Sequence, residues 1–104
     1  MKTIHEISDM IEDEIEGAEE YAEKAVHLKE KNPSLAKTFY DISLDEVKHI
    51  GLLHDEVKKL IEAHRKEHGE PPAPMMAVYE HLHQKHMDKV AYIKVLQGEY
   101  RAVM

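Results

Sequence analysis

Proline occurs in only two stretches of the 104-residue chain, at Pro33 and in the run Pro71-Pro72-Ala73-Pro74. Between these stretches the apolar residues recur every three to four positions, which is the period of an amphipathic α-helix. Proline breaks a helix interior but suits the first helical position after an asparagine cap, so Asn32-Pro33 closes one helix and opens the next. The sequence therefore predicts an all-α protein. The expected helices cover about residues 4–31, 33–68 and 75–103, with a proline-rich linker at 70–74.

The short turn between the first two predicted helices also predicts how they pack. A connection of this length makes neighbouring helices antiparallel, so the first two should form a hairpin. Each is at least about 40 Å long at 1.5 Å per residue, as in a long helical bundle. The chain has room for a single domain over residues 1–104, made of this hairpin and a third helix.

The composition limits the chemistry that the chain can perform. It has a formal net charge of −7, no cysteine, nine histidines and 21 acidic residues. Without thiolates, any metal must be held by carboxylates and imidazoles. The acidic balance disfavours a nucleic-acid partner, and no apolar run approaches the roughly 20 residues that span a bilayer. With no hydrophobic segment near the N-terminus, we expect a cytoplasmic protein without a membrane partner.

Three polar residues interrupt the apolar stripes of the predicted hairpin. Glu14 lies on the face of Ile7 and Tyr21, and Glu46 and His49 stand where the stripe of the second helix should continue. Burying an ionised group costs several kcal/mol unless it is paired or bound to a metal. The i, i+3 spacing puts Glu46 and His49 on one face, and antiparallel pairing brings Glu14 to the same level. This Glu-x-x-His with a nearby glutamate predicts a carboxylate-rich metal site.

The motifs of the hairpin resemble those of the ferritin-like superfamily and, within it, the rubrerythrin-type branch. The resemblance rests on Glu14-x6-Tyr21, on the stretch from Asn32 to Phe39 and on Asp45-Glu46-Val47-Lys48-His49, and it covers about residues 4–62. It implies a di-iron centre in which Glu14 and His49 are terminal ligands and Glu46 bridges the two irons. It also implies that Tyr21 hydrogen-bonds to these ligands.

A complete site of this kind needs more residues than the hairpin offers. It takes a Glu from each of two helices and a Glu-x-x-His from each of two others, and the hairpin carries one half. Glu80 and His83 spell a second Glu-x-x-His on the third helix, but an intrachain site would still lack one carboxylate. We therefore favour a homodimer that contributes Glu14, Glu46 and His49 twice, which is similar to the arrangement in encapsulated ferritins; a higher homo-oligomer would contain the same pairing.

The resemblance implies a ferroxidase or a peroxide-handling oxidoreductase that uses dioxygen or peroxide as the oxidant. The absence of cysteine excludes the rubredoxin module that full rubrerythrins use to deliver electrons, which favours iron oxidation. The same ligands also accept manganese or zinc, so metal binding without redox chemistry remains an alternative. A helical interaction module without enzymatic activity, with the Glu/His cluster as a buried polar network, is another.

For the other histidines and for the acidic residues of the first helix, we expect positions at a helix end, in the packing between helices or at the surface. Cationic side chains are favoured near the C-terminal end of a helix, which suits His64 and His68. The densest group of histidines is expected to have packing or solvent roles, with auxiliary metal binding or a metal-entry path as the alternatives; it comprises His81, His83 and His86. Residues expected at the surface or rim are His5, His27 and His54. Residues expected on a solvated acidic face are Glu12, Asp13, Glu16, Glu19 and Glu20.

Overall fold

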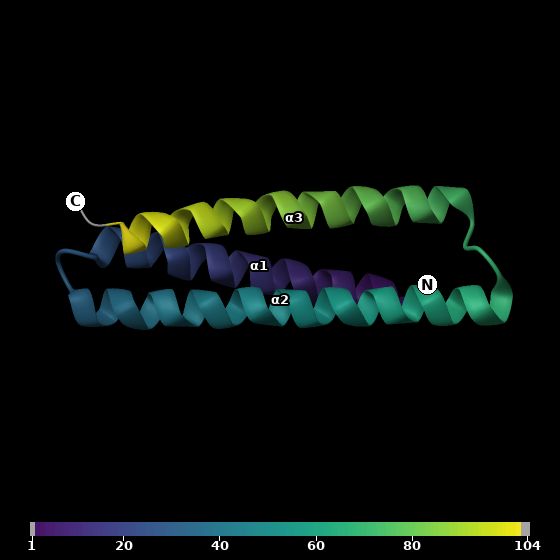
Figure 1. The fold of residues 1–104 in the computed structure, drawn as a ribbon, viewed down its shortest axis with the longest axis horizontal. Helices are drawn as coiled ribbons and strands as arrows, with labels where there is room; N and C mark the ends of the chain where they lie inside the picture. The colour runs from purple at the N-terminus through teal and green to yellow at the C-terminus, as the bar shows by residue number, and fades with distance from the viewer. Residues whose placement is uncertain (1, 103–104) are drawn as a thin grey trace.

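The computed structural model describes residues 2–102 and consists of three long helices that run alongside one another (Figure 1). The helices are α1 (Lys2–Leu28), α2 (Pro33–His68) and α3 (Ala73–Arg101). The molecule is a rod with principal extents of 55, 18 and 17 Å. The predicted all-α class and the order of three helices are confirmed.

The turn between α1 and α2 is built around Asn32. Its side-chain oxygen accepts a hydrogen bond from the backbone N–H of Leu35 at 3.2 Å, and its own N–H donates to the carbonyl of Leu28 at 2.8 Å. Pro33 disfavours a helical conformation for the residue before it, so the chain leaves the helix ahead of the cap. As a result α1 ends at Leu28, three residues earlier than the apolar period suggests.

The second connection begins at Gly69, which ends α2 with a positive φ of 81°. This conformation favours glycine, and the Gly69 N–H closes the helix by donating to the carbonyl of Arg65 at 3.0 Å. The prolines then carry the chain to α3, which begins at Ala73, two residues earlier than expected. Its predicted end at residue 103 lies outside the described residues.

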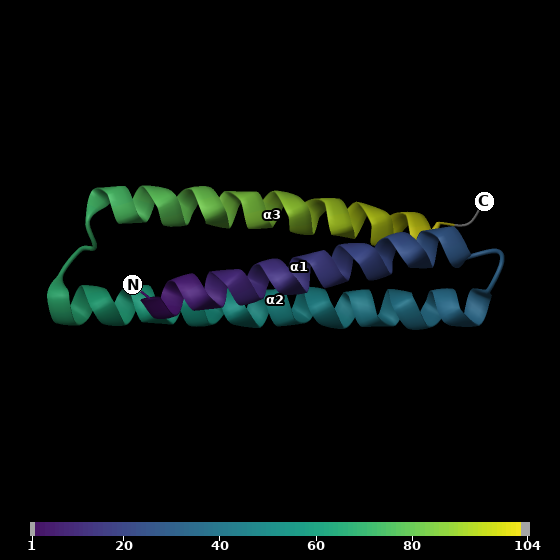
Figure 2. The ribbon, with the colours of Figure 1, turned by 180° about the vertical axis from the view of Figure 1, so that it is seen from behind.

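The helix α1 lies between the other two (Figure 2) and packs most closely against α2. Along this contact α1 presents the small residues Ala18, Ala22 and Ala25, each at most 1% exposed. Small side chains allow two helices to approach closely. The largest buried side chains include Ile11 of α1 and Ile93 of α3, so the core extends to all three helices.

Polar contacts attach the last turns of α3 to α2. The Tyr100 ring stacks on Tyr40 with centroids 4.4 Å apart, and Arg101 Nη1 donates to the Tyr40 hydroxyl at 2.7 Å. In the interior, Gln97 Nε2 donates to Ser43 Oγ at 3.1 Å. Since a buried amide is costly without a partner, this pair helps define where α3 sits.

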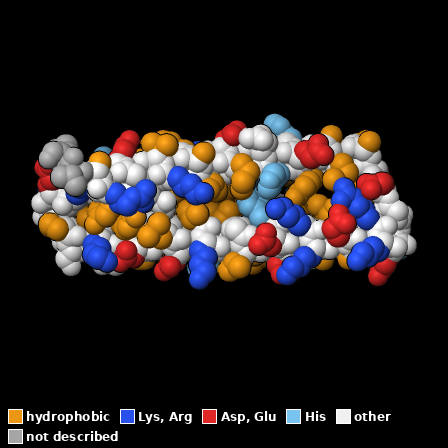
Figure 3. Space-filling model, viewed as in Figure 1, with side chains coloured by type: hydrophobic (Ala, Val, Ile, Leu, Met, Phe, Trp, Pro, Cys, Tyr) orange, Lys and Arg blue, Asp and Glu red, His pale blue; other side chains and the backbone are white. Residues whose placement is uncertain are grey.

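Two acidic residues expected on a solvated face of α1 instead contact α3. Glu12 Oε1 lies 3.5 Å from Nε2 of His86, and Glu19 Oε1 lies 3.5 Å from Nζ of Lys89. The side chain of Glu12 is still 45% exposed, whereas that of Glu19 is 23% exposed, so the solvated face is narrower than expected because α3 covers a second side of α1. Charged side chains are spread over the face drawn in Figure 3. Over residues 2–102, none of the helices is long and apolar enough to cross a membrane.

Candidate metal centre

The hairpin brings together Glu14 of α1 with Glu46 and His49 of α2. One possible ligand atom from each side chain lies within 4.8 Å of the other two. The closest recorded approach joins Nδ1 of His49 and Oε2 of Glu14, which are 3.4 Å apart. Within residues 2–102 this is the one group of three such side chains with converging ligand atoms. The structure therefore places all three predicted ligands at one level.

A glycine creates the space that the Glu46 carboxylate occupies. Gly17 is almost one turn after Glu14 on α1, and a Cβ built there would lie 3.5 Å from Oε2 of Glu46. A methyl group would just touch the carboxylate at this distance, and a longer side chain would compete for the same space. The pairing of Glu46 with Glu14 thus depends on a small residue at position 17 as well as on the ligands themselves.

The Glu14 carboxyl group perturbs that of Glu46. The hydrogen bond to Glu14, then burial, then the negative charge of Glu14 raise the pKa of Glu46 from 4.5 to about 7. The neighbouring His49 acts in the opposite direction. Near neutral pH this carboxyl pair therefore tends to hold a proton between its members, and a bound cation would take the place of that proton.

The group opens to one side of the hairpin. The side chain of Glu14 is 30% exposed and that of His49 is 50% exposed. Glu12 contacts α3, and Glu14 lies about 200° further round α1 at 100° per residue, so its side chain projects away from α3. Neither Glu80 nor His83 joins the group. A single chain therefore brings together only Glu14, Glu46 and His49, which is half of the ligand set of a ferritin-like di-metal site.

The ring of Tyr21 packs across the hairpin. Its centroid lies 5.5 Å from that of Phe39, with the planes inclined at 48°. This contact is the packing role expected of an aromatic residue on an apolar stripe. A hydrogen bond from Tyr21 to the ligands stays a prediction.

The position of His54 differs from the expected surface or rim location. Its side chain is in the core at 7% exposure. The reason is visible in the helical period, because His54 is four residues after Ile50 and three before Val57, both 1% exposed. Burial, followed by the nearby His83 and His86, lowers the pKa of His54 to about 4, so its ring is neutral at neutral pH. His5 and His27 are exposed, as expected.

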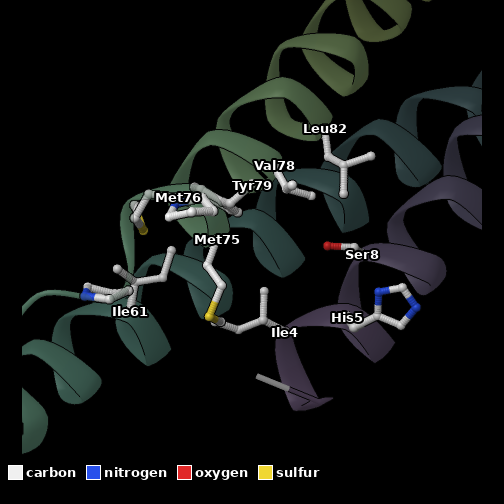
Figure 4. A pocket seen from close by; sticks show the side chains of 11 residues that line it. Ile4, His5, Ser8, Ile61, Met75, Met76, Val78, Tyr79 and Leu82 are labelled. Atoms are coloured by element: carbon white, nitrogen blue, oxygen red, sulfur yellow. The ribbon is translucent and has the colours of Figure 1, made fainter.

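The candidate metal centre is separate from a large apolar cavity of the molecule. This cavity, of about 390 Å³, opens where α3 begins (Figure 4). Ile4 of α1, Ile61 of α2 and Met75 of α3 contribute to its lining, whereas Glu14, Glu46 and His49 do not. The polar group is thus an open cluster on the hairpin, without an enclosed substrate cavity in a single chain.

A hairpin of long helices with a glutamate on one and Glu-x-x-His on the other defines a ferritin-like class of helical protein. The family model described as Rubrerythrin matches residues 7–102, and the chain belongs to this family. The match includes α3, which the motifs of the hairpin did not cover. No curated protein and no solved structure matches the chain. Members of the family typically bind iron, and two carboxylates with an imidazole are donors that suit this metal.

Proposed function

We propose that the protein is a di-iron carboxylate oxidoreductase, and in particular a ferroxidase, whose site is completed across a homodimer. The observation that carries this proposal is the convergence of Glu14, Glu46 and His49 in a chain of the rubrerythrin family. In this proposal the two copies of Glu14, Glu46 and His49 together would hold two irons. Glu14 and His49 would be terminal ligands, Glu46 would bridge the two irons, and Tyr21 would orient the ligands.

The dimer is proposed because one chain supplies half of the ligands and leaves an apolar surface around them. Met10, just over one turn before Glu14, is 54% exposed. Ile7, Ile42 and Leu53 flank the group on both helices and are only half-buried. A twofold axis through the group would cover these side chains and bring two copies of the ligands face to face. We call this surface of α1 and α2 the hairpin face.

The side chains of the hairpin face have distinct roles in this proposal. Bound ferrous ions supply one electron each, enough together to reduce dioxygen to peroxide or peroxide to water. Glu46 releases its shared proton when a cation binds, and its carboxylate then compensates the cation's charge. The apolar flanks exclude bulk water from the closed site. The chain has no cysteine to hold a further iron site for electron delivery, which favours ferrous iron as the electron source.

The proposal is tested by loading metal-free protein with Fe(II) under anaerobic conditions and then admitting air. We expect about two irons per dimer and the near-ultraviolet absorbance of an oxo-bridged ferric pair. Glu46→Gln, which keeps the size of the side chain, should abolish this absorbance. Glu56→Gln, an exposed position on the same helix, is the matched control and should behave like the unmodified protein.

Two results would contradict the proposal. One is an absence of absorbance change with full iron binding, and the other is equal iron binding by the Glu46→Gln protein. Elemental analysis of protein purified without a histidine tag separates the alternatives. Zinc or manganese without oxidation indicates non-redox metal binding, and no metal indicates a helical interaction module.

A further inference from the structure

Three histidines gather where α2 faces α3, and they are separate from the group formed by Glu14, Glu46 and His49. His54 of α2 and His86 of α3 are 7% and 4% exposed, and His83 of α3 is half-buried. The ring centroid of His54 lies 5.0 Å from that of His83 and 5.7 Å from that of His86. Figure 3 shows histidine side chains between these two helices.

The inward-facing nitrogens of this histidine cluster lack partners. Nε2 of His54 and Nδ1 of His83 are buried and have no hydrogen-bond partner among residues 2–102. An unpaired polar nitrogen in the interior costs free energy, and most buried polar groups in proteins avoid this cost. Two such nitrogens in adjacent rings are unusual for residues that serve only as packing.

The third ring is held by a carboxylate. Nε2 of His86 lies 3.5 Å from Oε1 of Glu12. When Nε2 carries the proton and donates to this carboxylate, Nδ1 is left as the lone-pair nitrogen. Histidines that bind metals commonly donate their other ring nitrogen to a carboxylate in this way.

The spacing of the rings and the space between them suit one metal ion. In a tetrahedral zinc site, with zinc–nitrogen distances of about 2.1 Å, the centroids of two ligating rings lie about 5 Å apart. The three histidines line a cavity of about 10 Å³ together with Ser8 and Tyr79, which is room for about one water molecule or one ion. The ring nitrogens do not yet converge within 4.8 Å, so binding requires rotation of the rings.

We propose that His54, His83 and His86 form a second metal site, which takes a divalent transition-metal ion of the zinc type and fastens α3 to α2. Its all-imidazole donors differ from the carboxylates of the hairpin, so it selects metals that prefer nitrogen ligands. The rotation of the rings that binding requires would also enlarge this cavity, so that a water molecule can complete the coordination beside the metal. The contact between α2 and α3 is otherwise slight at this level, so the metal restrains the helix that is packed least tightly.

The test uses full-length, metal-free protein without a histidine tag, titrated with zinc chloride in a Glu46→Gln background that disables the hairpin ligands. We expect this protein to bind one Zn²⁺ per chain and to unfold at a higher temperature with zinc than without it. Adding His83→Gln should lower the zinc affinity at least about tenfold and remove the thermal shift. Adding His64→Gln, a histidine elsewhere on α2, should change neither.

Substitution of His83 is preferred to substitution of His54 because His83 is only half-buried, and circular dichroism verifies that the helices remain. Visible absorbance of the Co(II)-loaded protein gives a second readout, since tetrahedral cobalt absorbs strongly and His83→Gln should remove this signal. Absence of zinc binding by the Glu46→Gln protein overturns the inference. So does an equal affinity with and without His83→Gln. Neither result bears on iron oxidation at the hairpin, which is measured in the unsubstituted chain.

Discussion

At the scale of single residues, the candidate metal centre depends on a small residue at position 17. Gly17 leaves room for the carboxylate of Glu46, whose pKa is raised to about 7 mainly by its hydrogen bond to Glu14. Glycine costs helix stability relative to alanine, and here that cost accompanies a cluster of ionisable groups. A small residue at this position therefore serves the site, and glycine adds a cost to the helix that alanine would not.

Substitution of Gly17 should separate these two effects. Gly17→Leu fills the space beside Glu46 and should abolish Fe(II) binding, because the carboxylate can no longer lie between the helices. Gly17→Ala is the matched control, since its methyl group would only touch Glu46. It should retain iron binding and stabilise the fold by about 0.5–1 kcal/mol. Iron titration and urea unfolding measure the two quantities, and normal iron binding by Gly17→Leu would contradict the assignment.

At the scale of helices, α1 divides its surface between two neighbouring helices and a third side that is open in the single chain. Small residues such as Ala18 and Ala22 face α2, Glu12 and Glu19 face α3, and the side of Glu14 remains free for a partner. Such a division explains why the metal ligands are half-exposed in a single chain. It also makes the register between α1 and α2 decisive, because a shift of one turn would move Glu14 about 5 Å from Glu46.

The cap at Asn32 is the local element that starts α2 in this register. Asn32→Ala removes the acceptor for the Leu35 N–H and should lower the free energy of unfolding by about 1 kcal/mol. Asn32→Asp keeps an acceptor and adds a negative charge at a helix N-terminus, so its stability should match or exceed that of the unmodified chain. Urea unfolding of the three proteins compares them. Equal stability of Asn32→Ala and the unmodified protein would show that packing alone sets the turn.

At the scale of the whole molecule, the rod carries the candidate group Glu14, Glu46 and His49 on its hairpin face, which is half of the ligand set of the proposed di-metal site. The family match over residues 7–102 includes α3, yet α3 covers the side of α1 opposite the ligands. The third helix therefore stabilises the hairpin without completing the site. This leaves a second copy of the chain as the simplest source of the missing ligands.

A charge on the hairpin face should prevent this assembly. Met10→Lys places an ammonium group about one turn from Glu14, where a dimer would bury it, and should give a monomer that no longer forms the oxo-bridged ferric pair. Val95→Lys changes a similarly exposed apolar residue, 58% exposed on α3, and should leave the dimer intact. Size-exclusion chromatography with light scattering reads the molar mass. A strict monomer in the unmodified, iron-loaded protein would refute the shared site.

Much of the fold, and the convergence of the ligands within the hairpin, could be predicted from interactions between residues close together in the sequence. The three helices, the turn at Asn32 and the common level of Glu14 and Glu46 come from capping, periodicity and the constant rise of a helix. These properties depend on residues close together in the chain. The observed helix ends differ from the predicted ones by only a few residues. At these ends, proline and the capping residues decide where the helix stops, and the apolar period does not.

The tertiary structure alone decided how α3 packs and therefore which polar residues are buried. The period that places His54 between Ile50 and Val57 does not reveal that His83 and His86 come to meet it from another helix. In the same way, the sequence leaves Glu12 and Glu19 on an acidic face until α3 is laid against them. The helical period indicates which side of a helix is apolar. Which element covers a polar side chain depends instead on contacts between residues far apart in the chain.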